Sequence, residues 1–541
     1  MKQSLLALGL DFGTESVRAL LVDLAGREVA SAVASYRHGQ ITRHLPDTSR
    51  PLPPDFALQH PLDWIDASAA AVRQARARAR VPGPSIISIG VDFTSCTMLP
   101  TRADGTPLCL DKSLARQPFA WPKLWKHHGA KSQTRRINEL AARRKEKWLA
   151  RYGGIIGLEW FFPKILETLE NAPDIYAAAE VWLEAGDWYV WQLLGPEQCP
   201  AAQLPRSTCQ AGYKAMWNAR EGYPCRAFFA ALDRRLGDVV EKRMPGRLLA
   251  PGTCAGRLGP AMARKLGLIP GIPISAAIID AHAGVPGAGV AEDGTLVMVM
   301  GTSSCHMLNS RHQKLVPGVA GVVEGGILPG FFGYETGQAA VGDAFDWFRR
   351  FAGRDFAVLD REAAALAPGS GEVLGLDWMN GCRTPLMDGH LRGAFTGLSL
   401  GTTPGMMYRA LLEASAFGLR WIVDVLREGG VPVHKFVATG GLPHHNPLLV
   451  QIYADVLGAP ITIHPSRQGP ALGAAILGVL AAGPEVTGFA SMQAAMRALA
   501  APKPRRPGGQ ALTIRPDRRT RQPYAAAYQR YRHLAHTLSQ A

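Results

Sequence analysis

The sequence predicts an α/β protein made of two similar halves, and three observations support this prediction. The chain has 541 residues, with 47% hydrophobic and 19% charged composition, which is ordinary for globular proteins but too long for one core. Strand-like runs such as Ile86 to Val91 alternate with helix-like runs such as Tyr408 to Leu426, which is α/β patterning. An apolar strand leading into a Gly-Thr-x-Ser turn occurs twice.

The duplicated turn locates the two halves along the chain. LALGLDF leads into GTES at residues 13–16, and LVMVM leads into GTSS at residues 301–304. A second strand-like segment follows each turn, so each copy predicts a β-hairpin. We therefore expect one domain over residues 1–285 and a second over residues 286–541, with the active site in the cleft between them.

These turns are candidate phosphate-binding loops. Gly, Thr and Ser expose N–H groups and hydroxyls without side-chain bulk, so such a turn can wrap phosphate oxygens. One copy alone would be an ordinary hairpin turn, whereas two copies at the same structural place favour phosphate binding. Because no G-x-x-x-x-G-K-[ST] and no G-x-G-x-x-G motif occurs, we assign phosphate binding to the hairpins. The candidate residues are Gly13, Thr14, Ser16, Arg18, Gly301, Thr302 and Ser303.

Two aspartates are candidates for the chemistry itself. Asp11 precedes the first turn, where a carboxylate could hold Mg²⁺ against the phosphates, directly or through water; the alternative is a turn-capping role. Asp280 follows the apolar run Ile274 to Ile279, so it stands at the carboxyl end of a strand, just before a predicted helix. Because α/β proteins present catalytic groups there, we expect Asp280 to be a general base, with a helix N-cap as the alternative.

A pair of glycines closes a later strand-like run. Gly440 and Gly441 would let a flat ring such as adenine approach the backbone, although a plain strand-to-helix turn explains them equally well. Asn446 at the N-cap with Pro447 at the first helical position predicts that a helix starts there, and Asn446 joins the two glycines as a candidate nucleotide-binding residue.

Taken in order, these segments resemble the FGGY carbohydrate kinases, and the match spans residues 5 to about 480. It is carried by LDFGT at 10–14, IDAHAG at 279–284, MGTS at 300–303 and the glycine pair at 440–441. Within the family the sequence is most similar to the ribulokinases. This finer likeness is carried by VDFTSCTMLP at 91–100, KLWKHH at 123–128, RSTCQAGYK at 206–214, GTSSCH at 301–306 and YETGQAAVGD at 334–343.

The resemblance implies a ribonuclease-H-like, actin-like ATPase fold in each half, ATP with Mg²⁺, and transfer of the γ-phosphoryl group to a ketopentose. L-Ribulose is the expected acceptor, giving L-ribulose 5-phosphate in L-arabinose catabolism; D-ribulose, xylulose or a polyol is the alternative. Carried over by motif, Asp280 would be the base, and Ser95, Cys96, Lys214 and Glu335 would contact the sugar with it. A non-catalytic ATP-binding clamp would not need this set, which argues against that further alternative.

Charge and cysteine content limit the partners and the compartment. The formal charge of +15 is spread along the chain, so we expect an anionic small molecule rather than a nucleic acid as its partner. Eight cysteines without a C-x-x-C pair argue against a zinc module or a disulfide scaffold. With no signal peptide or membrane span predicted, we expect a cytoplasmic protein. The sequence does not determine an oligomeric state, and a homodimer stays open.

Overall fold

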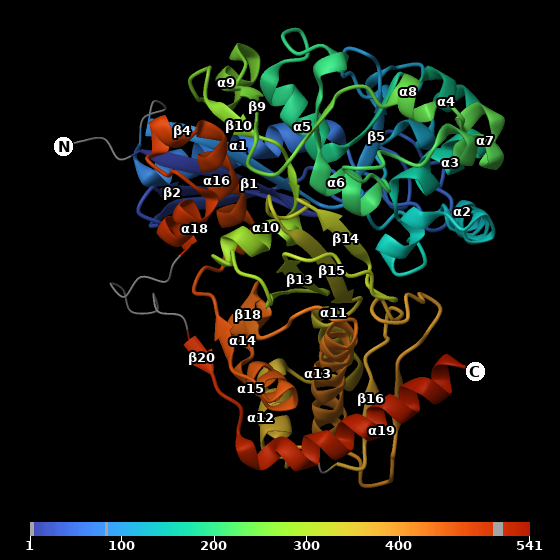
Figure 1. Cartoon of the computed structure of the whole chain (residues 1–541), viewed down its shortest axis with the longest axis vertical. Coiled ribbons are helices and arrows are strands. Elements are labelled where there is room, and N and C mark those ends of the chain that lie inside the picture. The colour runs from blue at the N-terminus through green and yellow to red at the C-terminus, as the bar shows by residue number, and fades with distance from the viewer. Residues whose placement is uncertain (1–4, 82–84, 370, 501–511, 541) are drawn as a thin grey trace.

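A computed structural model describes residues 5–81, 85–369, 371–500 and 512–540. Two bodies are stacked along the long axis of the molecule, each with a mixed sheet and helices beside it (Figure 1). The predicted α/β class with two similar halves is confirmed.

The first sheet has the strand order β3-β2-β1-β4-β10-β9, and β11 also pairs with β4. Its first three strands form an antiparallel meander, whereas β4, β10 and β11 run parallel to the central strand β1. The bounds are β1 Leu6–Phe12, β2 Ser16–Asp23, β3 Glu28–Ser35, β4 Ile86–Phe93, β9 Cys254–Arg257, β10 Pro273–Ser275 and β11 Ile278–Ile279.

The second sheet repeats this arrangement in the order β14-β15-β13-β12-β18-β19-β20. The strands β12, β13 and β15 take the places of β1, β2 and β3, and β18 pairs in parallel with β12 as β4 does with β1. The bounds are β12 Thr295–Met300, β13 Ser304–Ser310, β14 Gly321–Glu324, β15 Phe332–Gln338, β18 Lys435–Thr439, β19 Ile461–Ile463 and β20 Leu512–Ile514.

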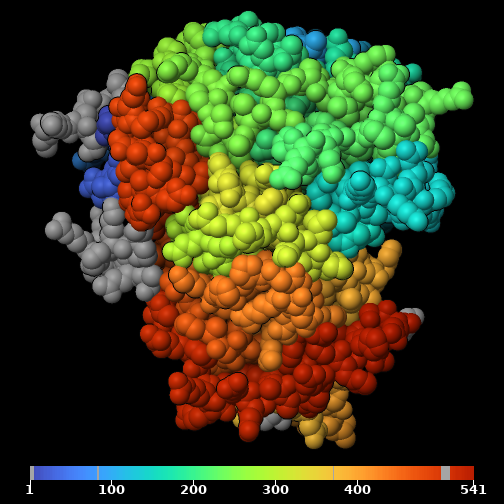
Figure 2. All heavy atoms as spheres, in the orientation of Figure 1, coloured from blue at the N-terminus to red at the C-terminus, as the bar shows by residue number. Residues whose placement is uncertain are grey.

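A helix from late in the chain packs on the first sheet. The helix α16 (Gly469–Ala482) contacts β1, β4 and α10 (Asp280–Gly287), and Figure 2 shows this orange-red segment on the upper body. A Cβ on Gly9 would lie 1.9 Å from the Ala471 carbonyl oxygen, so only glycine allows this approach. The domain division after residue 285 stays a prediction, with α16 completing the first body in space.

The segment between β4 and β9 forms a lobe whose apolar core also includes side chains from residues 41–58. It holds the short strand pairs β5 (Met98–Thr101) with β6 (Val181–Glu184) and β7 (Pro205–Ser207) with β8 (Arg247–Leu249). Its helices are α2 Lys131–Arg144, α3 Phe161–Asn171, α4 Pro173–Ala178, α5 Ala185–Leu194, α6 Thr208–Lys214, α7 Arg226–Leu232 and α8 Val239–Arg243. The Ser207 hydroxyl caps α6 by accepting from the Gln210 N–H, which sets the helix that ends at Lys214.

Among the remaining helices, α1 packs on the first sheet, and α13 and α15 pack on the second; these last two are the helices predicted near 408–426 and from 447. The bounds of the remaining helices are α1 Pro61–Ala79, α9 Pro260–Leu266, α11 Gly342–Ala352, α12 Phe356–Ala364, α13 Pro404–Glu428, α14 Leu442–His445, α15 Pro447–Leu457, α17 Pro484–Thr487, α18 Met492–Ala500 and α19 Arg521–Ser539. A two-stranded ribbon joins β16 (Leu374–Leu376) to β17 (Ala394–Thr396).

Within the described ranges, no helix by itself has the length and apolar composition of a membrane span. Two helical segments, Gly469–Ala482 and Pro484–Ala500, meet that criterion only as a pair, across a bend of 110°.

Candidate active site

Three aspartates lie at neighbouring strand ends of the first sheet. Asp11 in β1 is in register with Asp92 in β4, and Ile279 in β11 is in register with Phe93, so Asp280 follows at the same edge. Asp280 is the first residue of α10, and its Oδ1 accepts a 2.7 Å hydrogen bond from the Ala281 N–H. The structure thus places Asp280 at a strand's end, as expected, while Ile279 occupies the N-cap position.

The surroundings of these aspartates make their carboxyl groups unusual. Burial raises the pKa of Asp280 to about 7; the hydrogen bond from Ala281 opposes this rise, and the negative charge of Asp11 adds to it. Burial, followed by the charges of Asp11 and Asp280, raises the pKa of Asp92 well above its usual range. Asp11 itself has a cationic partner, because Arg18 Nη1 lies 3.0 Å from its Oδ2. A carboxyl group that titrates near neutrality is suited to accept a proton from a hydroxyl.

Lys214 and Glu335 meet in a buried ion pair. Lys214 ends α6 and Glu335 lies on β15, yet the ammonium is 2.8 Å from both carboxylate oxygens, and each side chain is 3% exposed. Burial opposes both charges, but each partner outweighs it: the pKa of Lys214 is raised, and that of Glu335 is lowered to about 2. The two predicted sugar-binding residues are therefore adjacent and both charged at neutral pH.

Two further residues border this pair. His282, two residues after Asp280, has its Nε2 3.5 Å from Glu335 Oε2, and burial lowers its pKa to about 3, so the ring is neutral. Among the described residues, neither ring nitrogen of His282 has a hydrogen-bond partner. Arg383 Nη2 lies 3.9 Å from Glu335 Oε1. The sequence motif contains His282 without marking its role, and nothing in the sequence pattern indicates Arg383.

Ser95 and Cys96 follow β4 in the same region. Cys96 is buried with a φ of 60°, in the left-handed region, and its carbonyl accepts a 2.7 Å hydrogen bond from Lys164. Burial raises the pKa of the Cys96 thiol to about 12, and the charge of Lys214 opposes the rise. Ser95 is half-buried, with its Oγ 3.3 Å from Cys96 Sγ. The turn therefore lies within electrostatic reach of the Lys214–Glu335 pair.

The two glycine turns are similar in sequence but differ in geometry. In the first, the Gly13 N–H donates to the Ser16 carbonyl at 3.0 Å; in the second, the Gly301 N–H donates to the Ser303 carbonyl at 2.9 Å. The second turn is thus one residue shorter. Neither glycine has a left-handed φ, and an added Cβ would meet nothing closer than 3.5 Å at Gly13 and 3.8 Å at Gly301. The fold alone does not require glycine there, which leaves space for a ligand to approach.

Neighbouring segments hold both turns in place. The Trp125 indole N–H donates to Thr14 Oγ1 at 3.0 Å, and Gln59 donates to the Thr14 carbonyl at 2.7 Å. In the second turn, the Thr302 carbonyl accepts from the N–H groups of Val341 and Asp343 at the start of α11. Ser16 is the first residue of β2, beside the turn.

The three residues predicted to bind the nucleotide have different surroundings in the structure. Gly440 has a φ of 96°, and an added Cβ would lie 2.4 Å from the Met300 carbonyl oxygen, so the fold itself requires this glycine. Gly441 is open, with the nearest atom 4.0 Å from its would-be Cβ. Asn446 caps α15 as predicted, accepting from the Leu449 N–H at 2.8 Å and donating to Asp360 at 2.9 Å. These partners already engage the Asn446 amide.

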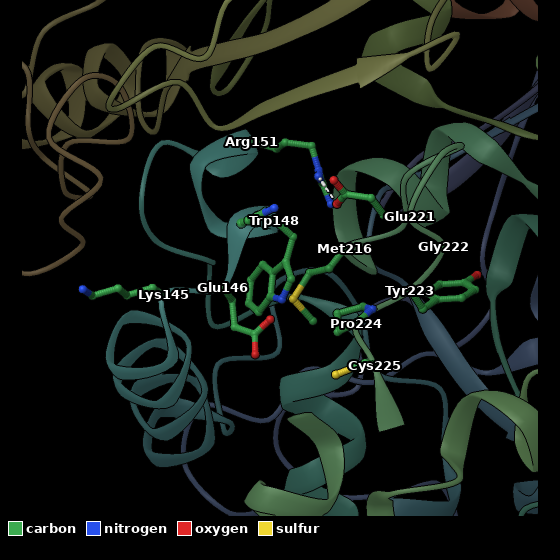
Figure 3. Close-up of a pocket in the computed structure, with 11 residues that line it drawn as sticks. Lys145, Glu146, Trp148, Arg151, Met216, Glu221, Gly222, Tyr223, Pro224 and Cys225 are labelled. Carbon is green, nitrogen blue, oxygen red and sulfur yellow. Dashed lines mark hydrogen bonds and ion pairs between the residues drawn. The ribbon is translucent and has the colours of Figure 1, made fainter. Parts of the chain in front are cut away.

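A hollow of about 370 Å³ lies elsewhere, between the helical turn at 147–152 and the loop at 216–225. Figure 3 shows Trp148 facing Met216 and Pro224 across it, with Arg151 paired to Glu221 at 2.7 Å. None of the predicted site residues lines this hollow, so it is separate from the candidate active site.

A group of possible metal ligands lies near the start of α1. His38, His60 and Asp63 bring ligand atoms within 4.8 Å of one another. However, the two imidazole rings are stacked, with an interplanar angle of 16°, and the His38 Nδ1 is bonded to Asp63 Oδ1 at 2.8 Å. Ring lone pairs lie in the ring planes, so two nearly parallel rings do not converge on one ion, and we interpret the group as a hydrogen-bonded helix start.

Comparison with known proteins identifies relatives along nearly the whole chain. The N-terminal domain model of the FGGY family of carbohydrate kinases matches residues 6–287, and the C-terminal domain model matches residues 296–482. A ribulokinase of Geobacillus thermodenitrificans is 47% identical, covering 90% of this chain and 87% of that relative. A ribulokinase of Shouchella clausii is 45% identical, covering 97% of this chain and 94% of that relative.

Solved structures show the same fold. A crystal structure described as a xyloylose kinase from Brucella ovis superposes with a TM-score of 0.79 at 25% identity, covering 99% of both chains. A ligand-bound xylulose kinase from Lactobacillus acidophilus also gives 0.79, at 18% identity, covering 99% of this chain and 98% of that one.

Proposed function

Because the chain belongs to the FGGY family of carbohydrate kinases, we propose that it phosphorylates L-ribulose with ATP, giving L-ribulose 5-phosphate for L-arabinose catabolism. The observation that carries the proposal is the buried Lys214–Glu335 pair beside the start of α10, in a chain 47% identical to a ribulokinase. Asp280, two residues before His282 on that helix, is the proposed base.

The sugar would be recognised by charged and neutral groups that lie close together. A ketopentose offers hydroxyls and a carbonyl, so it needs both donors and acceptors. Lys214 and Arg383 supply donors, Glu335 supplies acceptors, and the neutral His282 ring supplies one of each. Ser95 and Cys96 would border the same space. Because Lys214, Glu335 and His282 are buried, each unmet hydrogen bond to them is costly, which favours a sugar with the matching pattern of oxygens.

Asp280 would accept the proton of the attacking hydroxyl. Phosphoryl transfer has a loose transition state, so positioning does most of the work and the proton leaves late. The raised pKa of Asp280, about 7, makes it a better proton acceptor than an ordinary carboxylate.

The residues fit ATP with a divalent cation. Mg²⁺ prefers oxygen ligands, and Asp11 presents a carboxylate at the strand end that leads into the first glycine turn. The proposed phosphate contacts are Gly13, Thr14, Ser16, Arg18, Gly301, Thr302 and Ser303, and the proposed adenosine contacts are Gly440, Gly441 and Asn446. Bound Mg²⁺ would offset negative charge on the phosphates.

The compartment belongs to the same proposal. All eight cysteines are unpaired, as a reducing environment would leave them, which supports a cytoplasmic location.

A panel of acceptors tests the function. The full chain is assayed for ADP release with L-ribulose, D-ribulose, D-xylulose and ribitol, each with ATP and Mg²⁺. We expect kcat/KM to be highest for L-ribulose. Preference for another acceptor would replace the substrate and keep the kinase, whereas ATP binding without acceptor-dependent turnover would contradict the kinase and favour a clamp.

A further inference from the structure

Asp92 is a buried carboxylate without a hydrogen-bond partner. The residue is 0% exposed, and neither of its side-chain oxygens has a partner among the residues that the structure describes. Buried polar groups are nearly always paired, because an unpaired carboxylate loses its hydration without compensation. The side chain that interacts with Asp92 is another acid, Asp11, which cannot balance a negative charge, so an ionised Asp92 needs a cation.

The position of Asp92 points to the candidate active site. In adjacent parallel strands, residues in register point to the same side, and Asp92 is in register with Asp11. Two residues earlier on each strand, Gly9 and Gly90 contact α16, so this face of the sheet is the one that α16 covers. Asp92 therefore lies on the same face as Asp11, at the end of the strands that leads into the first glycine turn.

The duplicated sheet shows that the fold does not need acids here. Val299 stands two residues before Gly301, as Asp11 stands two before Gly13, and Val299 is in register with Thr439. Val299 and Thr439 thus hold the places of Asp11 and Asp92 in the second sheet. The same strand pairing is made there without a carboxylate, so the acidic pair belongs to the chemistry of the first body.

The charges in this region match a divalent cation. Asp11, Asp92 and Asp280 act electrostatically on one another, and Arg18 contacts Asp11 at 3.0 Å. In their ionised forms, the three carboxylates with one guanidinium would carry a formal charge of −2, and a bound cation would favour these ionised forms over the protonated ones. Carboxylate oxygens are the protein ligands that Mg²⁺ prefers, and it commonly takes one or two of them while keeping several waters.

We propose that Asp92 is the second carboxylate, with Asp11, that holds the Mg²⁺ accompanying ATP, either directly or through a coordinated water. This inference rests on the proposed function and adds a residue to its cation site. The ion supplies the partner that the buried carboxylate lacks, and it removes the repulsion between the neighbouring acids.

The test is the affinity for Mn²⁺, used as a paramagnetic probe in place of Mg²⁺. Free Mn²⁺ is measured by electron paramagnetic resonance during titration of the full chain, with and without ATP. The variant Asp92→Asn keeps the shape of the side chain and removes its charge. We expect it to bind Mn²⁺ about tenfold more weakly or worse, and its metal-free form to melt at a higher temperature than the wild type, because buried repulsion is removed.

A second buried acid provides the control. Asp377 is buried, but Gln338 and Tyr531 donate to its two oxygens at 2.7 Å each. Asp377→Asn should lower the melting temperature and leave Mn²⁺ affinity unchanged. Unchanged Mn²⁺ affinity in Asp92→Asn would overturn the proposal.

If Asp92→Asn does not fold, Asp92→Thr, which introduces the residue type found at Thr439, takes its place in the same titration. Failure of both variants to fold would show a structural role and also overturn the proposal. A wild type that binds Mn²⁺ with ATP but phosphorylates no sugar would contradict the proposed function and leave the ligand assignment standing.

Discussion

At the scale of single residues, the Lys214–Glu335 pair illustrates how a buried ion pair can serve recognition. Removing one partner of such a pair leaves the other charge buried and unpaired, which lowers the stability of a protein by about 3–5 kcal/mol. In this structure the two side chains satisfy each other while His282 and Arg383 stay close by. Under the proposed function, a sugar would meet charges that are already oriented, and its hydroxyls would add hydrogen bonds to the buried Lys214 and Glu335.

Lys214→Ala and Glu335→Ala should each lower kcat/KM for the preferred ketopentose by about tenfold or more, because a buried polar partner is left unpaired. Binding of ATP without sugar should barely change. The matched control is Glu413→Ala, which breaks the buried Arg409–Glu413 pair at 2.7 Å on α13. That variant should lose thermal stability and keep its sugar kinetics. The same pattern in the Lys214 and Glu335 variants would assign them to the fold instead.

Asp280 predicts a pH dependence. Its pKa of about 7 exceeds that of an ordinary aspartate, so the base form is lost as pH falls below about 7. The value of kcat/KM for the sugar should then fall by about tenfold per pH unit on the acid side. The sign for stability is opposite: a raised carboxyl pKa means that ionised Asp280 costs stability as pH rises from about 4 through about 7.

Asp280→Asn separates these effects. It should keep ATP and sugar affinity within several-fold and lower kcat by about 10²-fold or more, since the shape remains and the base is gone. Its melting temperature should exceed that of the wild type at pH 8, where Asp280 would be ionised, and match it more closely at pH 5. Near-normal turnover of the variant would remove Asp280 from the mechanism.

Part of this site is predictable from the sequence. Asp280 was predicted because a strand and a helix pattern meet there, and Lys214 and Glu335 through their motifs. Arg383 comes from an irregular loop, where no periodicity marks a contact made at long range. Asp92 stands inside a recognised motif, but its lack of partners is a property of packing and is visible only in three dimensions.

At the scale of elements, glycine is the residue whose role the sequence left most ambiguous. Gly287 lies in α10, and a Cβ there would lie 1.9 Å from the carbonyl oxygen of Gly469 in α16, so glycine allows the two helices to pack closely. An added Cβ on Gly473 would lie 1.8 Å from the Ala283 carbonyl oxygen. From the sequence alone, such a glycine is interpreted as a turn residue, because the helix that packs against it is distant along the chain. The strands and the long helices were predictable from local periodicity.

The glycine turns allow a test of phosphate binding that is independent of folding. Gly301→Val should leave thermal stability nearly unchanged, since nothing lies closer than 3.8 Å to the added Cβ, yet weaken ATP binding far more than sugar binding. Gly389→Val is the control, because it also has open space and no left-handed φ. Calorimetric titration with ATP and with sugar measures both. Equal losses for the two ligands, or a folding defect in Gly301→Val alone, would count against a phosphate role.

At the scale of the whole molecule, the two bodies share one strand order but have different side chains at matching places. The first body carries the three aspartates, and the second carries Val299 and Thr439 in register where the first has Asp11 and Asp92. Lys214 and Glu335 come from opposite sides of the predicted domain division and meet between them. This arrangement supports a chemistry performed where the bodies face each other, with water excluded by their contact.

The central claim, phosphorylation of L-ribulose, is tested most directly by following the phosphoryl group itself. The full chain is incubated with ATP, Mg²⁺ and L-ribulose, and ³¹P and ¹³C NMR identify the products. The account predicts that ATP is converted to ADP with an equal amount of a phosphate monoester on C5 of ribulose. Release of inorganic phosphate without a sugar ester, or no consumption of ATP in the presence of L-ribulose, would contradict it.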